Sequence, residues 1–187
     1  MDVRATAQRV NEAEGAPAPL DFEAVYAAHF AFVWRNLRRL GVSAAQLDDA
    51  AQDVFLVVHR RLAEVREDAL RPFLFGVVRR VAADQRRSAG RRAEGALDDV
   101  PEVASGAEDA SRQLERAEAA RVVRELLARL SDEQREVFVL AELEQMGAPE
   151  IASALGVPVN TVYSRLRAAR AAFEKQAARV VARQGVK

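Results

Sequence analysis

The sequence contains no cysteine, only two histidines and a single tryptophan among its 187 residues. The absence of cysteine excludes disulfides and thiolate metal sites, and His29 and His59 alone form no recognisable zinc-binding pattern. No apolar run approaches the roughly 20 residues of a membrane-spanning helix, and the first twenty residues lack the apolar centre of a signal peptide. We therefore expect a cytoplasmic protein that needs no metal or other cofactor and does not insert into a membrane.

The residue patterns that usually accompany catalysis are also missing. We find no pair of carboxylates in apolar surroundings, no nucleophile beside a base and no glycine-rich phosphate loop. These absences favour a protein that binds its targets without bond chemistry, and we do not expect an enzyme.

The chain has no net charge, because 28 basic and 28 acidic residues cancel, but the charges are unevenly distributed. Residues 1–92 contain 15 basic and 12 acidic residues, residues 93–120 contain 2 basic and 8 acidic residues, and residues 121–187 contain 11 basic and 8 acidic residues. The basic excess of the first part is concentrated in RRVAADQRRSAGRR, residues 79–92. Such a local patch attracts a polyanion, the alternative interpretation being a solvated helix end.

Apolar residues recur every three or four positions along the first half of the chain, which predicts helices. We expect Asp21 to cap the first helix and Gly41 to end it, Ser43 to open the second and Pro72 to begin the third. Their apolar faces are interpreted as the core of a small helical bundle. No alternation is long enough to predict a strand, so the expected fold class is all-α.

The middle of the chain separates two such modules. Residues 88 to about 110 are rich in Ala, Gly, Asp and Glu without an apolar stripe, which is typical of a flexible linker. Helical periodicity then resumes, and Ser131 with Gln134 has the pattern of a capping box. We expect a second domain of four helices and about 70 residues, near the lower limit of independent stability.

The stretch from Gly147 to Arg170, GAPEIASALGVPVNTVYSRLRAAR, predicts a helix-turn-helix. Pro149 suits the first position of its first helix, Gly156 ends that helix, and Asn160 or Thr161 can cap the second. The second helix then turns outward polar and basic side chains that suit the major groove of DNA, although an ordinary surface hairpin is the alternative. The outward residues are Asn160, Thr161, Tyr163, Ser164, Arg165, Arg167 and Arg170.

Three stretches together resemble the sigma factors of bacterial RNA polymerase, in the short extracytoplasmic-function group that keeps only conserved regions 2 and 4. LDDAAQDVFLVVHRRL is similar to the polymerase-binding helix, RPFLFGVVRRVAADQRR to the helix for the −10 promoter element, and LSDEQREVFVLAELEQMGAPEIASALGVPVNTVYSRLRAAR to the region for the −35 element. The resemblance implies two small helical domains joined by a flexible linker. The implied divisions are a disordered segment 1–19, region 2 at 20–92, an acidic linker 93–111 and region 4 at 112–187.

The resemblance also implies that one face of the second helix binds core RNA polymerase. Asp49, Gln52 and Asp53 share a face because they are spaced by three and four residues. In the family this face docks on the β′ clamp helices, and carboxylates with an amide suit a partner rich in Arg. Region 4 is expected on the β flap. Without the resemblance, solubilising charges would be an equally good interpretation.

The −10 element is implied to contact the link from Ala63 to Arg71 and the third helix of region 2. Arg66, Glu67 and Asp68 lie where the family captures a base flipped out of the duplex. We expect Phe75 to stack on the opened bases and Phe73 to be buried. The arginines expected to hold the non-template strand are Arg79, Arg80, Arg86 and Arg87.

In region 4 the outward residues given above align with the family's recognition helix, and Arg165 and Arg167 are the best candidates for base or phosphate contacts. Tyr163 stands where relatives often have Lys or Arg, and Gly147 replaces a capping Ser or Thr. The family implies promoter DNA as a target and an anti-sigma factor as a further partner. The alternative function is a helix-turn-helix repressor or activator that binds DNA without polymerase.

Overall fold

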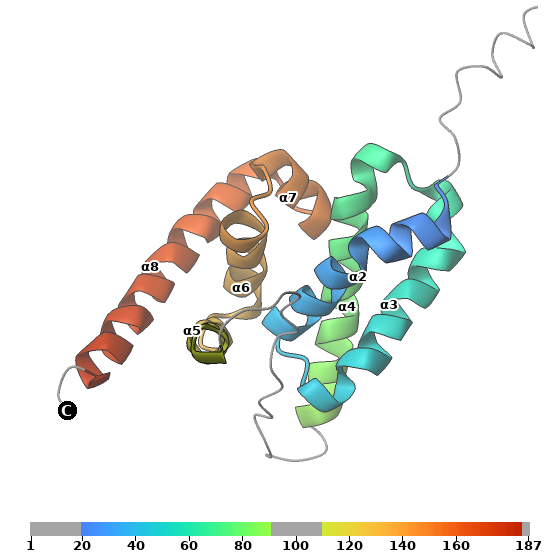
Figure 1. The fold of residues 1–187 in the computed structure, drawn as a ribbon. Coiled ribbons are helices and arrows are strands. Elements are labelled where there is room, and N and C mark those ends of the chain that lie inside the picture. The colour runs from blue at the N-terminus through green and yellow to red at the C-terminus, as the bar shows by residue number, and fades with distance from the viewer. Residues whose placement is uncertain (1–19, 91–109, 185–187) are drawn as a thin grey trace, which may run out of the picture.

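The computed structural model describes residues 20–90 and 110–184, and within these ranges every regular element is helical. The expected segment 1–19 and most of the expected linker 93–111 lie outside the described residues. Figure 1 shows two helical bundles, one from each half of the chain. The expected all-α fold class is thus confirmed for the described part. No helix in this part has the length and apolar character needed to cross a lipid bilayer.

The first bundle contains three long helices joined by short 3-10 turns. The helices are α2 (Phe22–Arg39), α3 (Leu47–Arg61) and α4 (Leu70–Gly90), and the turns are η1 (Ala44–Gln46), η2 (Leu62–Glu64) and η3 (Glu67–Ala69). Asp21 caps α2 as expected, since its Oδ2 accepts a hydrogen bond from the Ala24 amide at 2.9 Å. Gly41 follows with φ +91°, a left-handed conformation that glycine adopts without strain. These local signals place both ends of α2 as predicted.

Helix α4 begins earlier than expected, at Leu70 and not at Pro72. Proline is accepted in the first turn of a helix, because amide hydrogens there have no partner within the helix. The residues between α3 and α4 form the turns η2 and η3. Pro72 itself is buried.

The second bundle contains the four expected helices. They are α5 (Ala110–Ala128), α6 (Asp132–Phe138), α7 (Ala148–Leu155) and α8 (Val159–Gln184), with a π-helical turn η4 (Val139–Leu143) after α6. The capping box of α6 is confirmed, because the Gln134 amide donates to the Ser131 hydroxyl and the Ser131 amide donates to the Gln134 side chain, both at 3.3 Å. Phe138 stacks on Phe173 with 4.5 Å between ring centroids, which holds α6 against α8.

The helix-turn-helix consists of α7, a tight turn and α8. Gly147 precedes α7. The Gly147 amide donates a hydrogen bond to the Glu150 carboxylate at 2.9 Å, which is one of the two hydrogen bonds of a capping box. Pro149 occupies the second helical position, one later than predicted. Gly156 ends the helix with φ +67°, the left-handed conformation in which helices commonly terminate.

The prediction that Asn160 or Thr161 caps α8 is wrong. The helix already begins at Val159, so both residues lie within its first turn. The carbonyl of Pro158 accepts the Thr161 amide at 2.9 Å, and no side-chain cap is needed at this position. In the first turn the Asn160 side chain is exposed and the Thr161 side chain is half-buried.

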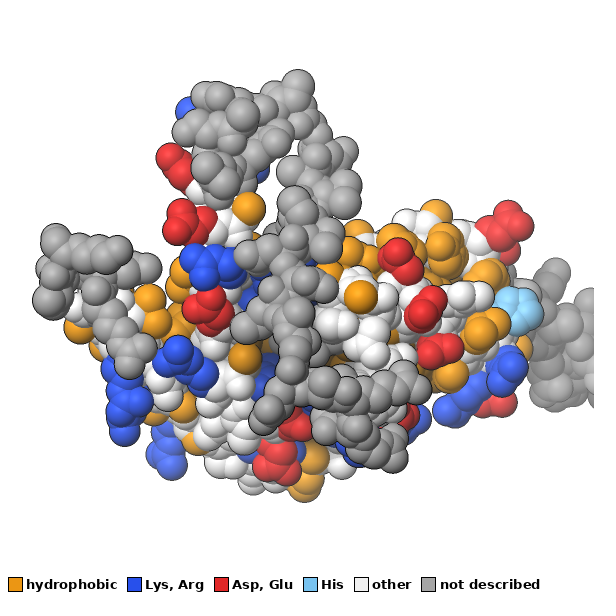
Figure 2. All heavy atoms as spheres, turned by 90° about the horizontal axis from the view of Figure 1, so that it is seen from below, with side chains coloured by type: hydrophobic (Ala, Val, Ile, Leu, Met, Phe, Trp, Pro, Cys, Tyr) orange, Lys and Arg blue, Asp and Glu red, His pale blue; other side chains and the backbone are white. Residues whose placement is uncertain are grey.

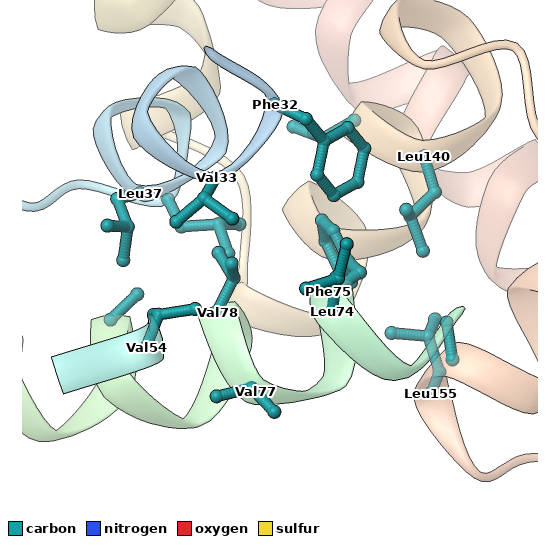
Figure 3. Close-up of a cluster of buried hydrophobic side chains, with 14 of the residues drawn as sticks. Phe32, Val33, Leu37, Val54, Leu74, Phe75, Val77, Val78, Leu140 and Leu155 are labelled. Carbon is teal, nitrogen blue, oxygen red and sulfur yellow. The ribbon is translucent and has the colours of Figure 1, made fainter. Parts of the chain in front are cut away.

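The two bundles pack against each other, which the sequence did not indicate. Helix α4 of the first bundle contacts α7 of the second. In Figure 3, Phe32 of α2 and Phe75 of α4 point toward Leu140 of η4, and Leu155 of α7 lies beside them. All four side chains are buried, and the hydrophobic core runs without interruption from one bundle into the other.

Candidate nucleic-acid interface

The first half of α8 presents a polar and basic surface. Asn160, Ser164 and Arg167 are exposed, and Tyr163 is 60% exposed. Val162 on the opposite side is fully buried, which fixes the rotation of the helix about its axis. A helix held in this way can insert its first turns into a major groove.

The remaining residues predicted on α8 are partly held by their own bundle. Arg165 Nη2 donates to Glu133 Oε1 at 2.6 Å, and Arg170 Nε donates to Glu142 Oε1 at 2.8 Å. Thr161 is half-buried. Ion pairs at a solvated surface contribute little energy, so a phosphate can replace either carboxylate. In Figure 2 basic side chains lie on the left, the side of α8.

Two of the arginines predicted on α4 face the second bundle and are only partly exposed. Arg79 Nη1 donates to Glu136 Oε2 at 3.3 Å, and Arg86 Nη2 donates to Asp132 Oδ2 at 2.8 Å. Arg86 also donates to the carbonyl of Leu40. The acidic partners belong to α6, so these contacts join the bundles.

The other two predicted arginines of α4 are exposed. Arg87 pairs with Asp84 one turn earlier in the same helix. Arg80 borders a hollow that Arg61 and Phe73 also line, where the first bundle meets α7. These cations remain available to a polyanion.

The predicted base-capture residues lie at the start of η3. Arg66, Glu67 and Asp68 are all exposed, and Arg66 Nε donates to Asp68 Oδ1 at 3.1 Å. The pair is local and solvated, so it presents polar groups without fixing a pocket of its own.

The expectation for the two phenylalanines of α4 is reversed. Phe75 is 0% exposed and belongs to the joint core, so it cannot stack on a base while the bundles stay together. Phe73 is only partly buried, and the guanidinium of Arg61 lies 5.6 Å from its ring centroid. Helical spacing could not separate the two, because the face that carries Phe75 is buried by the second bundle.

The predicted polymerase-binding residues lie together on α3. Asp49, Gln52 and Asp53 are exposed, whereas Ala50 and Val54 on the opposite face are fully buried. Beside this acidic face runs an exposed apolar groove between α2 and α3. The groove is lined by Phe22, Tyr26, Phe30, Phe55, Leu56 and His59. Figure 2 shows acidic and apolar side chains interspersed on the right, over the first bundle.

A buried carboxylate that was missed in the sequence, Glu144, joins the bundles, and its side chain is 2% exposed. Arg35 Nε and Nη2 donate to its two oxygens at 2.9 and 2.8 Å. Arg39 Nη1 donates at 2.5 Å and Asn36 Nδ2 at 3.1 Å. Arg71 Nη2 lies 3.6 Å from the carboxylate. We call these five residues the Glu144 cluster. The signal for it in the sequence is that Glu144 lies in the short polar segment ELEQ, residues 142–145, which follows the apolar run VFVLA.

The two buried carboxyls that face the first bundle have opposite pKa shifts. Burial raises the pKa of Glu144, but the hydrogen bonds and charge of Arg35, followed by the charge of Arg39, outweigh burial and bring it below the ordinary 4.5. Burial also raises the pKa of Glu136, and there Arg79 offsets only part of the increase. Glu144 is therefore the carboxylate that its surroundings hold ionised.

The geometry agrees with similarities to known proteins. Residues 25–92 match the family model for sigma-70 region 2, and residues 120–173 match the model for sigma-70 region 4. The chain is 35% identical over 164 residues to the ECF RNA polymerase sigma factor SigL of Mycobacterium tuberculosis, covering 84% of this chain and 89% of SigL. It is 34% identical over 149 residues to the ferric citrate uptake sigma factor FecI of Escherichia coli, covering 78% of this chain and 84% of FecI.

Two solved structures have a similar fold. CnrH in complex with the cytosolic domain of CnrY superposes with a TM-score of 0.62 at 27% identity, covering 83% of this chain and 86% of CnrH. The sigma factor RpoE in complex with the anti-sigma factor NepR from Bartonella quintana gives a TM-score of 0.65 at 19% identity, covering 83% of this chain and 95% of RpoE. The second similarity supports the fold alone.

Proposed function

The chain belongs to the extracytoplasmic-function group of the sigma-70 family, and from this premise we propose how its surfaces divide the work of transcription initiation. It is a sigma factor that directs RNA polymerase to promoters, not a repressor or activator that acts alone. The observation that carries the proposal is the separation of charge: the acidic face lies on α3, and the basic residues lie on α4 and α8.

Core RNA polymerase binds the acidic face of α3. Asp49, Gln52 and Asp53 are exposed together on a helix whose other side is locked in the core. Charge-assisted hydrogen bonds from arginines would recognise this face, which fits the β′ clamp helices as partner. The region 4 domain, expected at residues 112–187, would rest on the β flap and present α8 to DNA.

The −35 element is read by α8. Asn160, Tyr163, Ser164 and Arg167 are exposed, so they can reach base edges in a major groove. Arg165 and Arg170 exchange their surface carboxylates for phosphates or guanine. Thr161, half-buried in the first turn, supports this contact from the helix N-terminus.

The −10 element is opened by the region 2 domain, residues 20–92. Arg79, Arg80, Arg86 and Arg87 hold the backbone of the non-template strand, because a basic groove follows phosphates whatever the sequence. Arg66, Glu67 and Asp68 receive the flipped base, whose unstacking costs a few kcal/mol that these contacts offset. Phe73 replaces Phe75 as the aromatic side chain available for stacking.

The polymerase contact is tested by binding labelled full-length chain to core polymerase. We expect the variant Asp49→Asn with Asp53→Asn to bind at least about tenfold more weakly, a loss of about 1.4 kcal/mol. The matched control neutralises two exposed acidic residues of α5, Glu115→Gln with Glu118→Gln, and should bind like the wild type. Equal affinity of the α3 variant and the control would overturn the docking assignment.

An anti-sigma factor is the second expected partner. The structure of CnrH, 27% identical to this chain, contains the cytosolic domain of CnrY. A partner that covers α3 and α8 together would block polymerase and DNA at once. The protein acts in the cytoplasm, where polymerase and chromosome are, and leaves the phosphoryl transfer to polymerase.

A further inference from the structure

We propose that the protein binds a nucleotide in an arginine-lined pocket between α2 and α5, with the phosphates on the arginines and the base beside Trp34. None of the residues that line this pocket is among those assigned above to core polymerase or to promoter DNA. The inference therefore goes beyond the proposed function and gives the chain a small-molecule ligand of its own.

The pocket has a volume of about 210 Å³, and four arginines line it. They are Arg35, Arg38 and Arg39 of α2 and Arg124 of α5. All four are half-buried, so their charges are only partly hydrated. Charges in such a setting attract an anion more strongly than charges in open water do.

Positive charge exceeds negative charge around the pocket. Arg35 and Arg39 also belong to the Glu144 cluster, where Arg71 is the third arginine and Glu144 is the carboxylate. The pocket and the cluster together thus contain five arginines and one carboxylate, which is an excess of four positive charges. This excess suits a ligand with two or three negative charges better than it suits a single carboxylate.

The pKa of Glu144 agrees with this charge balance. Burial raises the pKa of Glu144, but the hydrogen bonds and charge of Arg35 and the charge of Arg39 hold it below the ordinary 4.5. The surroundings therefore stabilise one negative charge in spite of burial. A second anion beside the same arginines would be stabilised in the same way.

Arginine geometry suits the phosphates of a nucleotide. A guanidinium carries five N–H donors in one plane and binds phosphate oxygens in pairs, so one arginine can donate to two anions at once. Arg35 can therefore keep its hydrogen bonds to Glu144, at 2.9 and 2.8 Å, and still line a phosphate site. A diphosphate offers enough oxygens for several arginines together.

The rest of the pocket wall is apolar and aromatic, which suits a base. Trp34, Ala120, Val123 and Leu143 form it. The guanidinium of Arg38 lies 5.6 Å from the Trp34 ring centroid, and such stacking uses the face of the guanidinium and not its N–H donors. The flat surface of a purine adds to a stack of this kind. The apolar wall thus favours a nucleotide over inorganic diphosphate.

The size of the pocket sets how much of the ligand it encloses. Its 210 Å³ is below the roughly 300 to 1,000 Å³ of sites that enclose a whole ligand. We therefore expect the pocket to hold part of the nucleotide and to leave the rest at the protein surface.

The test uses the full-length chain, whose single tryptophan is Trp34, so that tryptophan fluorescence reports on the pocket directly. Adenosine diphosphate and guanosine diphosphate are titrated, with inorganic pyrophosphate, adenosine and guanosine as partial ligands. We expect a saturable change with the nucleotides. The partial ligands should bind at least about tenfold more weakly, because each lacks either the stacked base or the phosphates.

Two arginine variants locate the phosphates. Arg38→Gln with Arg124→Gln should weaken nucleotide binding at least about tenfold, because two guanidinium contacts are lost. The control Arg60→Gln with Arg129→Gln removes the same charge from exposed arginines that do not line the pocket, and it should bind like the wild type. Circular dichroism checks folding, and Arg124→Gln alone should give a smaller loss than the double variant.

A tryptophan variant locates the base. Trp34→Leu has no tryptophan, so calorimetry follows its binding. We expect it to bind the nucleotides about as weakly as pyrophosphate, while its affinity for pyrophosphate stays that of the wild type. A general disturbance of the fold would instead weaken both ligands together.

The absence of a saturable fluorescence change with either nucleotide would overturn the inference. So would equal nucleotide affinity of the Arg38 and Arg124 variant and its control, or pyrophosphate binding as tight as nucleotide binding. Nucleotide binding by a chain that fails to bind core polymerase would remove the proposed function and leave this inference standing. The two failures are therefore distinguishable.

Discussion

At the scale of single residues, Glu144 combines burial with charge. A carboxylate that is 2% exposed would ordinarily be costly, but two arginines and an asparagine donate to it. Removing one partner of such a group is strongly destabilising, whereas a solvated pair contributes little. Arg165 with Glu133 is the contrasting case, since 65% of the Glu133 side chain is exposed.

The pKa of Glu144 predicts how the contribution of this carboxylate to the free energy of unfolding depends on pH. Its pKa in the folded protein is below the ordinary 4.5, so the contribution is fully present above pH 4.5 and is lost as the pH falls through the lowered value. At neutral pH we expect Glu144→Gln to lower the free energy of unfolding by about 3 kcal/mol. Urea unfolding at several pH values should show this difference shrinking below pH 4.5. A difference that stays constant into acid would contradict the assignment.

The two phenylalanines of α4 give a second prediction. Phe75→Ala should lower the free energy of unfolding by about 3 to 5 kcal/mol, because it leaves a cavity in the joint core. Phe73→Ala should cost less than about 2 kcal/mol but should slow opening of promoter DNA by polymerase carrying the variant. Urea unfolding and permanganate reactivity of the −10 thymines measure the two effects. A larger stability loss at Phe73 would show that the burial pattern is misassigned.

At the scale of elements, the helix ends that could be predicted are those set by local chemistry. Asp21 and the Ser131 and Gln134 pair form the expected caps. The start of α8 could not be predicted, because Val159 carries no capping signal and the Pro158 carbonyl serves instead. The prediction that Pro72 begins α4 was wrong for a related reason, because proline is accepted at any position of the first turn.

Gly156 provides the element-scale prediction. Its φ of +67° is left-handed, and a Cβ added there would meet no atom within 4 Å, so a side chain is opposed by backbone strain alone. We expect Gly156→Ala to lower the free energy of unfolding by about 1 to 2 kcal/mol, and Gly156→Asn by less. Thermal unfolding of the two variants checks the order. Equal losses would mean that contacts, and not backbone conformation, select glycine at the turn.

At the scale of the whole molecule, periodicity predicted which faces are buried but not what buries them. The sequence could not show that the side of α4 with Phe75 is buried, because α7, which packs against α4, lies about 80 residues away in the sequence. The pairing of Arg79 with Glu136, 57 residues apart in the sequence, could not be predicted for the same reason. Residues on one helix face, such as Asp49 and Asp53, could be predicted together because a single helix determines their spacing.

The most direct test of the account is run-off transcription by core polymerase, with and without this protein, on a library of genomic fragments. We predict discrete start sites that appear only when the protein is added, preceded by two shared elements about 25 base pairs apart. The α3 variant Asp49→Asn with Asp53→Asn should reduce these transcripts, and Glu115→Gln with Glu118→Gln should not. Transcripts that do not depend on the protein, or selective binding of the same fragments without polymerase and without start sites, would contradict it.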